Sequence, residues 1–100
     1  MLEDSEYLRS NVLDSIAESG GLVVLQLIGR NDGLYDIYRA KRGRFPEPVA
    51  TDLSLEQARE FWAKALREMF VSMSNDGEEL EMLVAGRIES LFRARADNAD

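Results

Sequence analysis

The sequence predicts an α+β fold, made of a small antiparallel β-hairpin or three-stranded meander and three helices. The first observation is an almost unbroken apolar run from Leu22 to Ile28, which is rich in β-branched residues and too short for a stable helix. The second is a set of apolar residues that recur every three or four positions on both sides of this region. The expected order is helix, strand, strand, an optional third strand, helix and helix.

The length and composition predict one domain. One hundred residues can bury a hydrophobic core without disulfides or metals, so we expect a single domain over residues 1–100. The content of 45% hydrophobic and 31% charged residues is that of an ordinary globular protein. The polar tail from about residue 94 is expected to fray.

The first helix is expected over residues 5–19. Gly20 and Gly21 supply a C-terminal stop, and acidic residues near the start suit the positive end of a helix dipole. The apolar residues that fall on about half of a helical wheel are Leu8, Val12, Leu13, Ile16 and Ala17. We expect this helix to cover one face of the hairpin.

The hairpin is expected to pair residues 22–28 with residues 34–40 around the turn residues 29–33. If all five turn residues form the loop, Gln26 lies opposite Asp36 and the two side chains could share a hydrogen bond. Shorter loops would set Asp36 against Leu27 or Ile28 instead. Asp36 then has either a structural role or a contact with a ligand or partner.

An irregular segment follows, in which Pro46 and Pro48 favour an extended backbone that lacks two donors. Residues 49–51 could add a short third strand at the sheet edge, where proline is tolerated. Long loops often carry function, so this segment is a candidate for a partner contact.

Two helices are expected after this segment. Ser54 with Gln57, and Asp76 with Glu79, match the capping box that marks a helix start. The second helix has the strongest apolar period in the chain, and we expect Trp62 at its centre to be buried. The apolar residues of the third helix are Leu80, Leu83, Val84, Ile88, Leu91 and Phe92.

The composition excludes several kinds of chemistry. The chain has no Cys and no His, which removes disulfides, thiolate nucleophiles, imidazole bases and the commonest ligands of transition metals. Neither glycine-rich phosphate-loop pattern occurs. An enzyme would have to use carboxylates, Lys, Tyr or Ser, and a carboxylate- or Lys-based enzyme is a third, less favoured alternative. We expect no catalytic residues, no metal site and no cofactor. No apolar stretch reaches the roughly 18 residues that span a bilayer, so we expect a cytoplasmic protein without a membrane partner.

The net charge of −7 favours attraction to a basic partner surface. We expect a non-enzymatic acidic interaction protein, an inhibitor or regulator that docks on a larger protein, which could itself handle nucleic acid. The candidate acidic contacts are Asp14, Glu18, Glu78 and Glu81. Asp14 and Glu18 would lie on the first helix, on the side away from its apolar residues.

The alternative function is direct binding of RNA or DNA. A basic segment interleaved with aromatic residues could hold phosphates and stack bases, although the negative net charge argues against nucleic acid as the main partner. The candidate residues are Arg39, Lys41, Arg42, Arg44 and Phe45.

A homodimer is also expected, because the first strand is apolar on both faces. Gly86 on the third helix could permit close approach of another helix. Arg87 either lays its stem along the core and pairs with a carboxylate, or enters a subunit or partner interface as an anchor.

Overall fold

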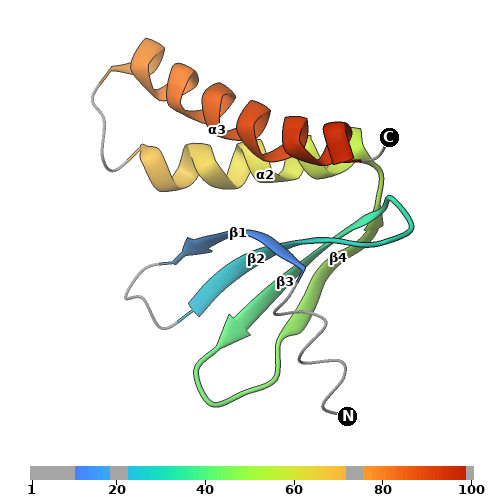
Figure 1. Cartoon of the computed structure of the whole chain (residues 1–100). Helices are drawn as coiled ribbons and strands as arrows, with labels where there is room; N and C mark the ends of the chain where they lie inside the picture. The colour runs from blue at the N-terminus through green and yellow to red at the C-terminus, as the bar shows by residue number, and fades with distance from the viewer. Residues whose placement is uncertain (1–10, 19–22, 72–75, 99–100) are drawn as a thin grey trace. The chain divides into compact units, whose positions relative to one another are not determined.

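The structure is a computed structural model that describes residues 11–18, 23–71 and 76–98. Within these ranges the chain is α+β, with a four-stranded antiparallel sheet and two helices (Figure 1). The chain divides into two compact units, Met1–Leu55 and Glu56–Asp100, which are described separately. The prediction of a single domain stays a prediction.

The sheet belongs to the first unit and is a simple meander. Its strands are β1 (Val12–Ala17), β2 (Val23–Gly29), β3 (Tyr35–Lys41) and β4 (Glu47–Leu53), in the spatial order β1-β2-β3-β4. Each strand is antiparallel to the next. The expected hairpin corresponds to β2 and β3, and the expected third strand is present as the longer strand β4.

The predicted first helix is wrong over residues 12–17, which form β1. Ile16 is buried between the exposed Ser15 and Ala17, as the two-residue period of a strand requires. An irregularity in pairing between Val12 and Asp14 leaves Leu13 as an extra residue. The apolar pattern therefore fits a bulged strand as well as a helix, and pairing with β2 satisfies the strand. Residues 5–10 and 19 of the predicted helix lie outside the described residues.

The register of β2 and β3 selects one of the predicted alternatives. Asp36 lies opposite Ile28, whereas Gln26 lies opposite Tyr38, so the Gln26–Asp36 pairing does not form. The loop keeps the expected length of five residues, but it comprises residues 30–34 instead of 29–33, because Gly29 still belongs to β2 and pairs with Tyr35. The loop is closed by the Arg30 N–H, which donates to the Leu34 carbonyl at 2.9 Å.

Strand β4 pairs with β3 along one edge of the described sheet, at the position expected for a strand that contains proline. Its register shifts twice, between the partners of Tyr35 and Ile37 and between those of Ile37 and Tyr38. Asp52 lies within the first irregularity and has a φ of 58°, in the left-handed region that is rare for residues other than glycine.

Apart from Ile16 on β1, the buried side chains of the described sheet lie on the parts of β2 and β3 next to their loop. Leu27 and Ile37 are cross-strand partners and are fully buried, and Ile28 is fully buried on the opposite face. Tyr35 is 4% exposed. Burial on both faces of β2 agrees with the apolar character of both faces in the sequence.

The second unit contains two helices, α2 (Leu55–Phe70) and α3 (Gly77–Asn98), which run antiparallel beside each other (Figure 1). Helix α2 begins directly after Ser54, the expected cap, and Trp62 is fully buried as predicted. Each helix has three buried residues at a spacing of four, which lie on one face of that helix. They are Ala58, Trp62 and Leu66 on α2, and Val84, Ile88 and Phe92 on α3.

Asp76 caps helix α3. Its Oδ1 accepts the N–H groups of Glu78 at 2.9 Å and Glu79 at 3.5 Å, which satisfies donors that the first helical turn leaves open. The helix continues to Asn98, so the backbone from residue 94 to residue 98 is helical. No helix in the described ranges is long and apolar enough to cross a membrane.

Candidate functional site

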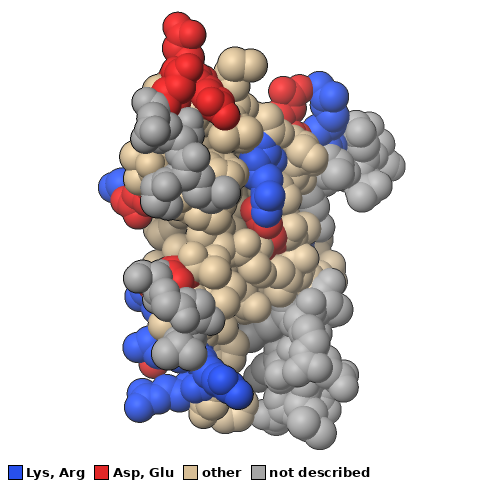
Figure 2. Space-filling view, turned by 90° about the vertical axis from the view of Figure 1, so that its left-hand side faces the viewer, with Lys and Arg blue, Asp and Glu red and all other residues tan. Residues whose placement is uncertain are grey.

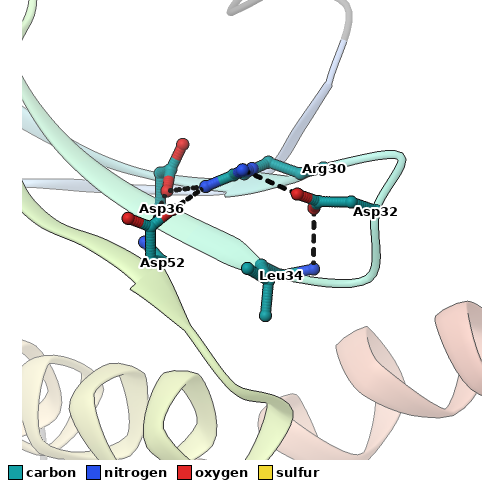
Figure 3. A network of polar contacts seen from close by, with 5 residues as sticks. All are labelled: Arg30, Asp32, Leu34, Asp36 and Asp52. Carbon is teal, nitrogen blue, oxygen red and sulfur yellow. Dashed lines mark hydrogen bonds and ion pairs between the residues drawn. The ribbon is translucent and has the colours of Figure 1, made fainter.

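An ionic network around Arg30 joins the β2–β3 loop to β4 (Figure 3). Arg30 Nη2 lies 2.6 Å from Asp32 Oδ2, and Nη1 lies 3.3 Å from Asp36 Oδ1 and also contacts Asp52 Oδ1. The Asp52 N–H donates to Asp36 Oδ1 at 3.0 Å, and the Leu34 N–H donates to Asp32 Oδ1 at 3.1 Å. The network thus holds the loop and the irregular part of β4 to the same guanidinium.

The electrostatics of this network stabilise the charge on Arg30. The pKa of Arg30 is raised above its ordinary value, chiefly by the hydrogen bond to Asp52 and then by Asp36 and the charge of Asp32, against an opposing effect of burial. The described residues contain no group of three or more metal-binding side chains placed to hold an ion. Each of the three carboxylates forms an ion pair with Arg30, and these pairs connect the β2–β3 loop to β3 and β4.

The β3–β4 turn carries a concentration of positive charge, which Figure 2 shows as basic side chains gathered at this turn. We call Lys41, Arg42, Arg44 and Phe45 the basic turn. All four residues are exposed, and Phe45 is 82% exposed. The Arg44 N–H donates to the Lys41 carbonyl at 3.0 Å, and Gly43 between them has a φ of 79°, which glycine adopts without strain.

Arg39, which we grouped with these cations from the sequence, is separated from them by an ion pair. Its Nε lies 3.2 Å from Glu18 Oε1, directly after β1. Both side chains are partly exposed. The structure therefore brings three of the four predicted cations together and assigns Arg39 to a contact across the sheet.

The first two turns of α3 carry exposed carboxylates around an exposed apolar side chain. We call Glu78, Glu79, Met82 and Leu83 the acidic helix start. Met82 is 74% exposed and Leu83 is 42% exposed. Figure 2 shows acidic side chains gathered over this end of α3.

Glu81 belongs to a different contact. Its carboxylate accepts two hydrogen bonds from Arg67 of α2, at 2.8 Å and 3.0 Å. These hydrogen bonds lower the pKa of Glu81 and raise the pKa of Arg67. Glu78 and Glu81 are both exposed, but the carboxylate of Glu81 is already paired with Arg67 between the two helices.

Asp14 and Glu18 do not form the predicted acidic helical face, because the chain is a strand in this region. Asp14 lies opposite Leu27 and is partly buried, and Glu18 pairs with Arg39. The assignment of these two residues to one solvent-facing side of a helix was therefore wrong.

Gly86 and Arg87 are both exposed on α3. A Cβ atom on Gly86 would meet nothing within 4 Å, so no neighbour in the described part of the chain requires glycine there. A contact with a second copy at this position stays a prediction.

Two features were missed in the sequence. The Arg30 network had no local signal, because Arg30 and Asp52 are 22 residues apart. The exposure of Met82 did have a local signal in the sequence. Met82 falls outside the apolar period of the third helix, and this position predicts a side chain that faces solvent.

Comparisons of the chain with family models, with curated proteins and with solved structures found no match.

Proposed function

We propose that this protein is a non-enzymatic interaction protein that docks its acidic helix start on a basic surface of a larger protein, as an inhibitor or regulator. The observation that carries the proposal is the 74% exposure of Met82 beside Glu78 and Glu79. Met82 lies four residues after Glu78 and three after Glu79, so the three side chains share one face of α3.

The chemistry of this face supports a protein partner. Methionine is flexible and polarizable, and it is common on surfaces that fill a partner's apolar pocket. The flanking carboxylates would then meet lysine or arginine residues at the rim of that pocket. The net charge of −7 would add long-range attraction to the same basic surface.

The absence of His and Cys from the whole sequence supports a function without catalysis, since it removes the usual bases and nucleophiles. The buried carboxylate Asp36 is bonded to Arg30 and to the backbone of β4, which is a structural use of a buried charge.

The test begins with the immobilised full-length protein and a lysate of the native host, from which bound proteins are recovered at low salt. Each recovered protein is then purified, and its association and dissociation rates are measured by stopped flow. We expect the association rate to fall as salt rises, because screening shortens the field of exposed charges to about 8 Å at physiological ionic strength.

Two variants separate the long-range attraction by the carboxylates, which sets the association rate, from the contact made by Met82, which sets the dissociation rate. Glu78→Lys with Glu79→Lys should slow association at least about tenfold, whereas Met82→Ala should mainly speed dissociation. Glu56→Lys with Glu60→Lys on α2 is the matched control, because it makes the same charge change at exposed positions outside the acidic helix start. Rates that respond equally to both double reversals, or to neither, would show that the acidity serves solubility and would overturn the proposal.

A further inference from the structure

The cations of the basic turn differ in their contacts from most arginines of the described sheet and helices. Arg39, Arg67 and Arg93 each form an ion pair with a glutamate. Among the residues that the structure describes, no ion pair involves the side chains of Lys41, Arg42 or Arg44. No acidic residue occurs between residues 37 and 46 either. Glu47 is the nearest acidic residue after the turn, and no ion pair of the described residues joins it to these cations. Three cations in the turn therefore face one nearby carboxylate, which leaves an excess of positive charge.

The turn geometry concentrates this charge. The hydrogen bond from Arg44 to Lys41 closes a four-residue turn, in which the first and last Cα atoms lie within about 7 Å of each other. Three like charges held in one exposed turn repel one another, and an anion placed between them relieves that repulsion. Arginine, which supplies two of the three charges, binds phosphate oxygens through two parallel N–H groups.

Phe45 indicates which anion fits. Its ring is 82% exposed directly after Arg44, which places a large apolar face in water next to the positive charge. A phosphate backbone with accessible bases offers both an anion for the cations and a flat ring for Phe45. An acidic protein surface supplies carboxylates without the stacked rings, and a duplex keeps its base faces inside the stack.

We propose that the basic turn is a binding site for single-stranded nucleic acid, in which Lys41, Arg42 and Arg44 contact phosphates and a base stacks on Phe45. This site lies in the sheet unit and does not use the acidic helix start. Three phosphate contacts predict a modest affinity with a defined salt dependence. The slope of log K against log salt is expected to be about −2, from about −0.7 for each phosphate contact to a single strand.

The test is fluorescence anisotropy of labelled oligo-dT and oligo-U with the full-length protein over a salt series. Arg42→Ala with Arg44→Ala should weaken binding and reduce the magnitude of the slope by about 0.7 for each cation removed. Phe45→Ala should weaken binding about tenfold and leave the slope unchanged, because stacking releases no counterions. A preference for oligo-U over oligo-dT, or the reverse, distinguishes RNA from DNA, and either supports the site.

Arg59→Ala with Lys64→Ala on α2 is the matched control, because it removes two exposed cations and gives the same net charge as the double variant of the turn. Circular dichroism verifies that all variants are folded. Four results would overturn the proposal: no binding at low salt, equal losses in the turn and α2 variants, an unchanged affinity in Phe45→Ala, or displacement of the oligonucleotide by polyglutamate at equal charge concentration. The last result would assign the turn to acidic proteins.

Discussion

Asp36 is the one charged residue that is buried among the described residues, at 8% exposure. A buried carboxylate is costly unless its oxygens are bonded, and Asp36 Oδ1 accepts both from Arg30 and from the Asp52 N–H. Asp36 therefore links the β2–β3 loop to the irregular part of β4 by a single oxygen atom. This supports the structural one of the two roles that the sequence left open.

Replacing Asp36 should show how much the two hydrogen bonds to its Oδ1 contribute to the free energy of unfolding. Asp36→Ala leaves the Asp52 N–H without its acceptor and should lower the free energy of unfolding by about 1–3 kcal/mol. Asp36→Asn keeps an oxygen that can accept the same bond, so its loss should be smaller. Urea unfolding of the three proteins measures the differences. Equal stabilities of Asp36→Ala and the wild type would reject the structural role.

The backbone at Asp52 allows a second prediction at the scale of one residue. Asp52→Gly and Asp52→Ala both remove the carboxylate that contacts Arg30, and they differ only in the cost of a φ of 58°. Glycine adopts this conformation without strain, so Asp52→Gly should be more stable than Asp52→Ala by about 1 kcal/mol. Thermal or urea unfolding measures this order. The reverse order, which is usual inside a strand, would show that Asp52 relaxes to ordinary strand geometry.

At the scale of elements, the two helices are joined by the Arg67–Glu81 pair. Both helices have the local signals of independent helix starts, but the pair connects the end of α2 to the start of α3 across 14 residues of sequence. The partners are exposed, so the pair aligns the helices more than it stabilises them.

The lowered pKa of Glu81 predicts a pH dependence. Above the ordinary value of 4.5 the carboxylate is ionised in both the folded and the unfolded chain, so the full contribution of the pair to stability is present. As pH falls through the lowered pKa of the folded state, Glu81 is protonated in both states and the contribution is lost. The stability difference between wild type and Glu81→Gln should therefore shrink between neutral and acidic pH, as measured by urea midpoints.

Glu89→Gln is the control for this prediction, because Glu89 pairs with Arg93 within α3 and does not join the two helices. A difference between wild type and Glu81→Gln that stays constant from neutral to acidic pH would contradict the assignment of the pKa shift to the Arg67 contact.

At the scale of the whole molecule, the two edges of the described sheet differ. The β4 edge contains Pro48, two register shifts and the strained Asp52, all of which hinder pairing with another strand. The β1 edge has one irregularity, between Val12 and Asp14, but it contains no proline, and no other strand among the described residues pairs with its outer side. If the predicted homodimer pairs through a sheet edge, we therefore expect it to use the β1 edge.

The predicted homodimer can be tested at this edge. The Glu18 N–H donates to the Val23 carbonyl, so the alternation of an antiparallel ladder directs the Ala17 N–H away from β2. We expect light scattering to show a dimer at high micromolar concentration and Ala17→Pro to dissociate it without loss of a ladder bond. If the wild-type protein is a monomer at that concentration, the prediction of a homodimer is wrong.

The sequence by itself determined the elements whose signals are local. The hairpin and the two capped helices follow from turn residues, capping residues and apolar period, and so does the burial of Trp62. The sequence left the third strand open, and pairing with β3 decided it. The exposure of the basic turn also follows from its composition. These features depend on residues within a few positions of one another, so a single chain segment contains the whole signal.

The tertiary structure decided the features that depend on residues distant in sequence: the conformation of residues 12–17, the strand register and the ion pairs between strands. Residues 12–17 fit a helical wheel and a bulged strand equally well, and the unpaired side of β2 selected the strand. The register that sets Asp36 opposite Ile28, and the contacts that join Arg30 to Asp52 and Arg39 to Glu18, arise only when the strands meet. Long-range pairing carries no local signal, because either member of the pair could be satisfied by water until the sheet forms.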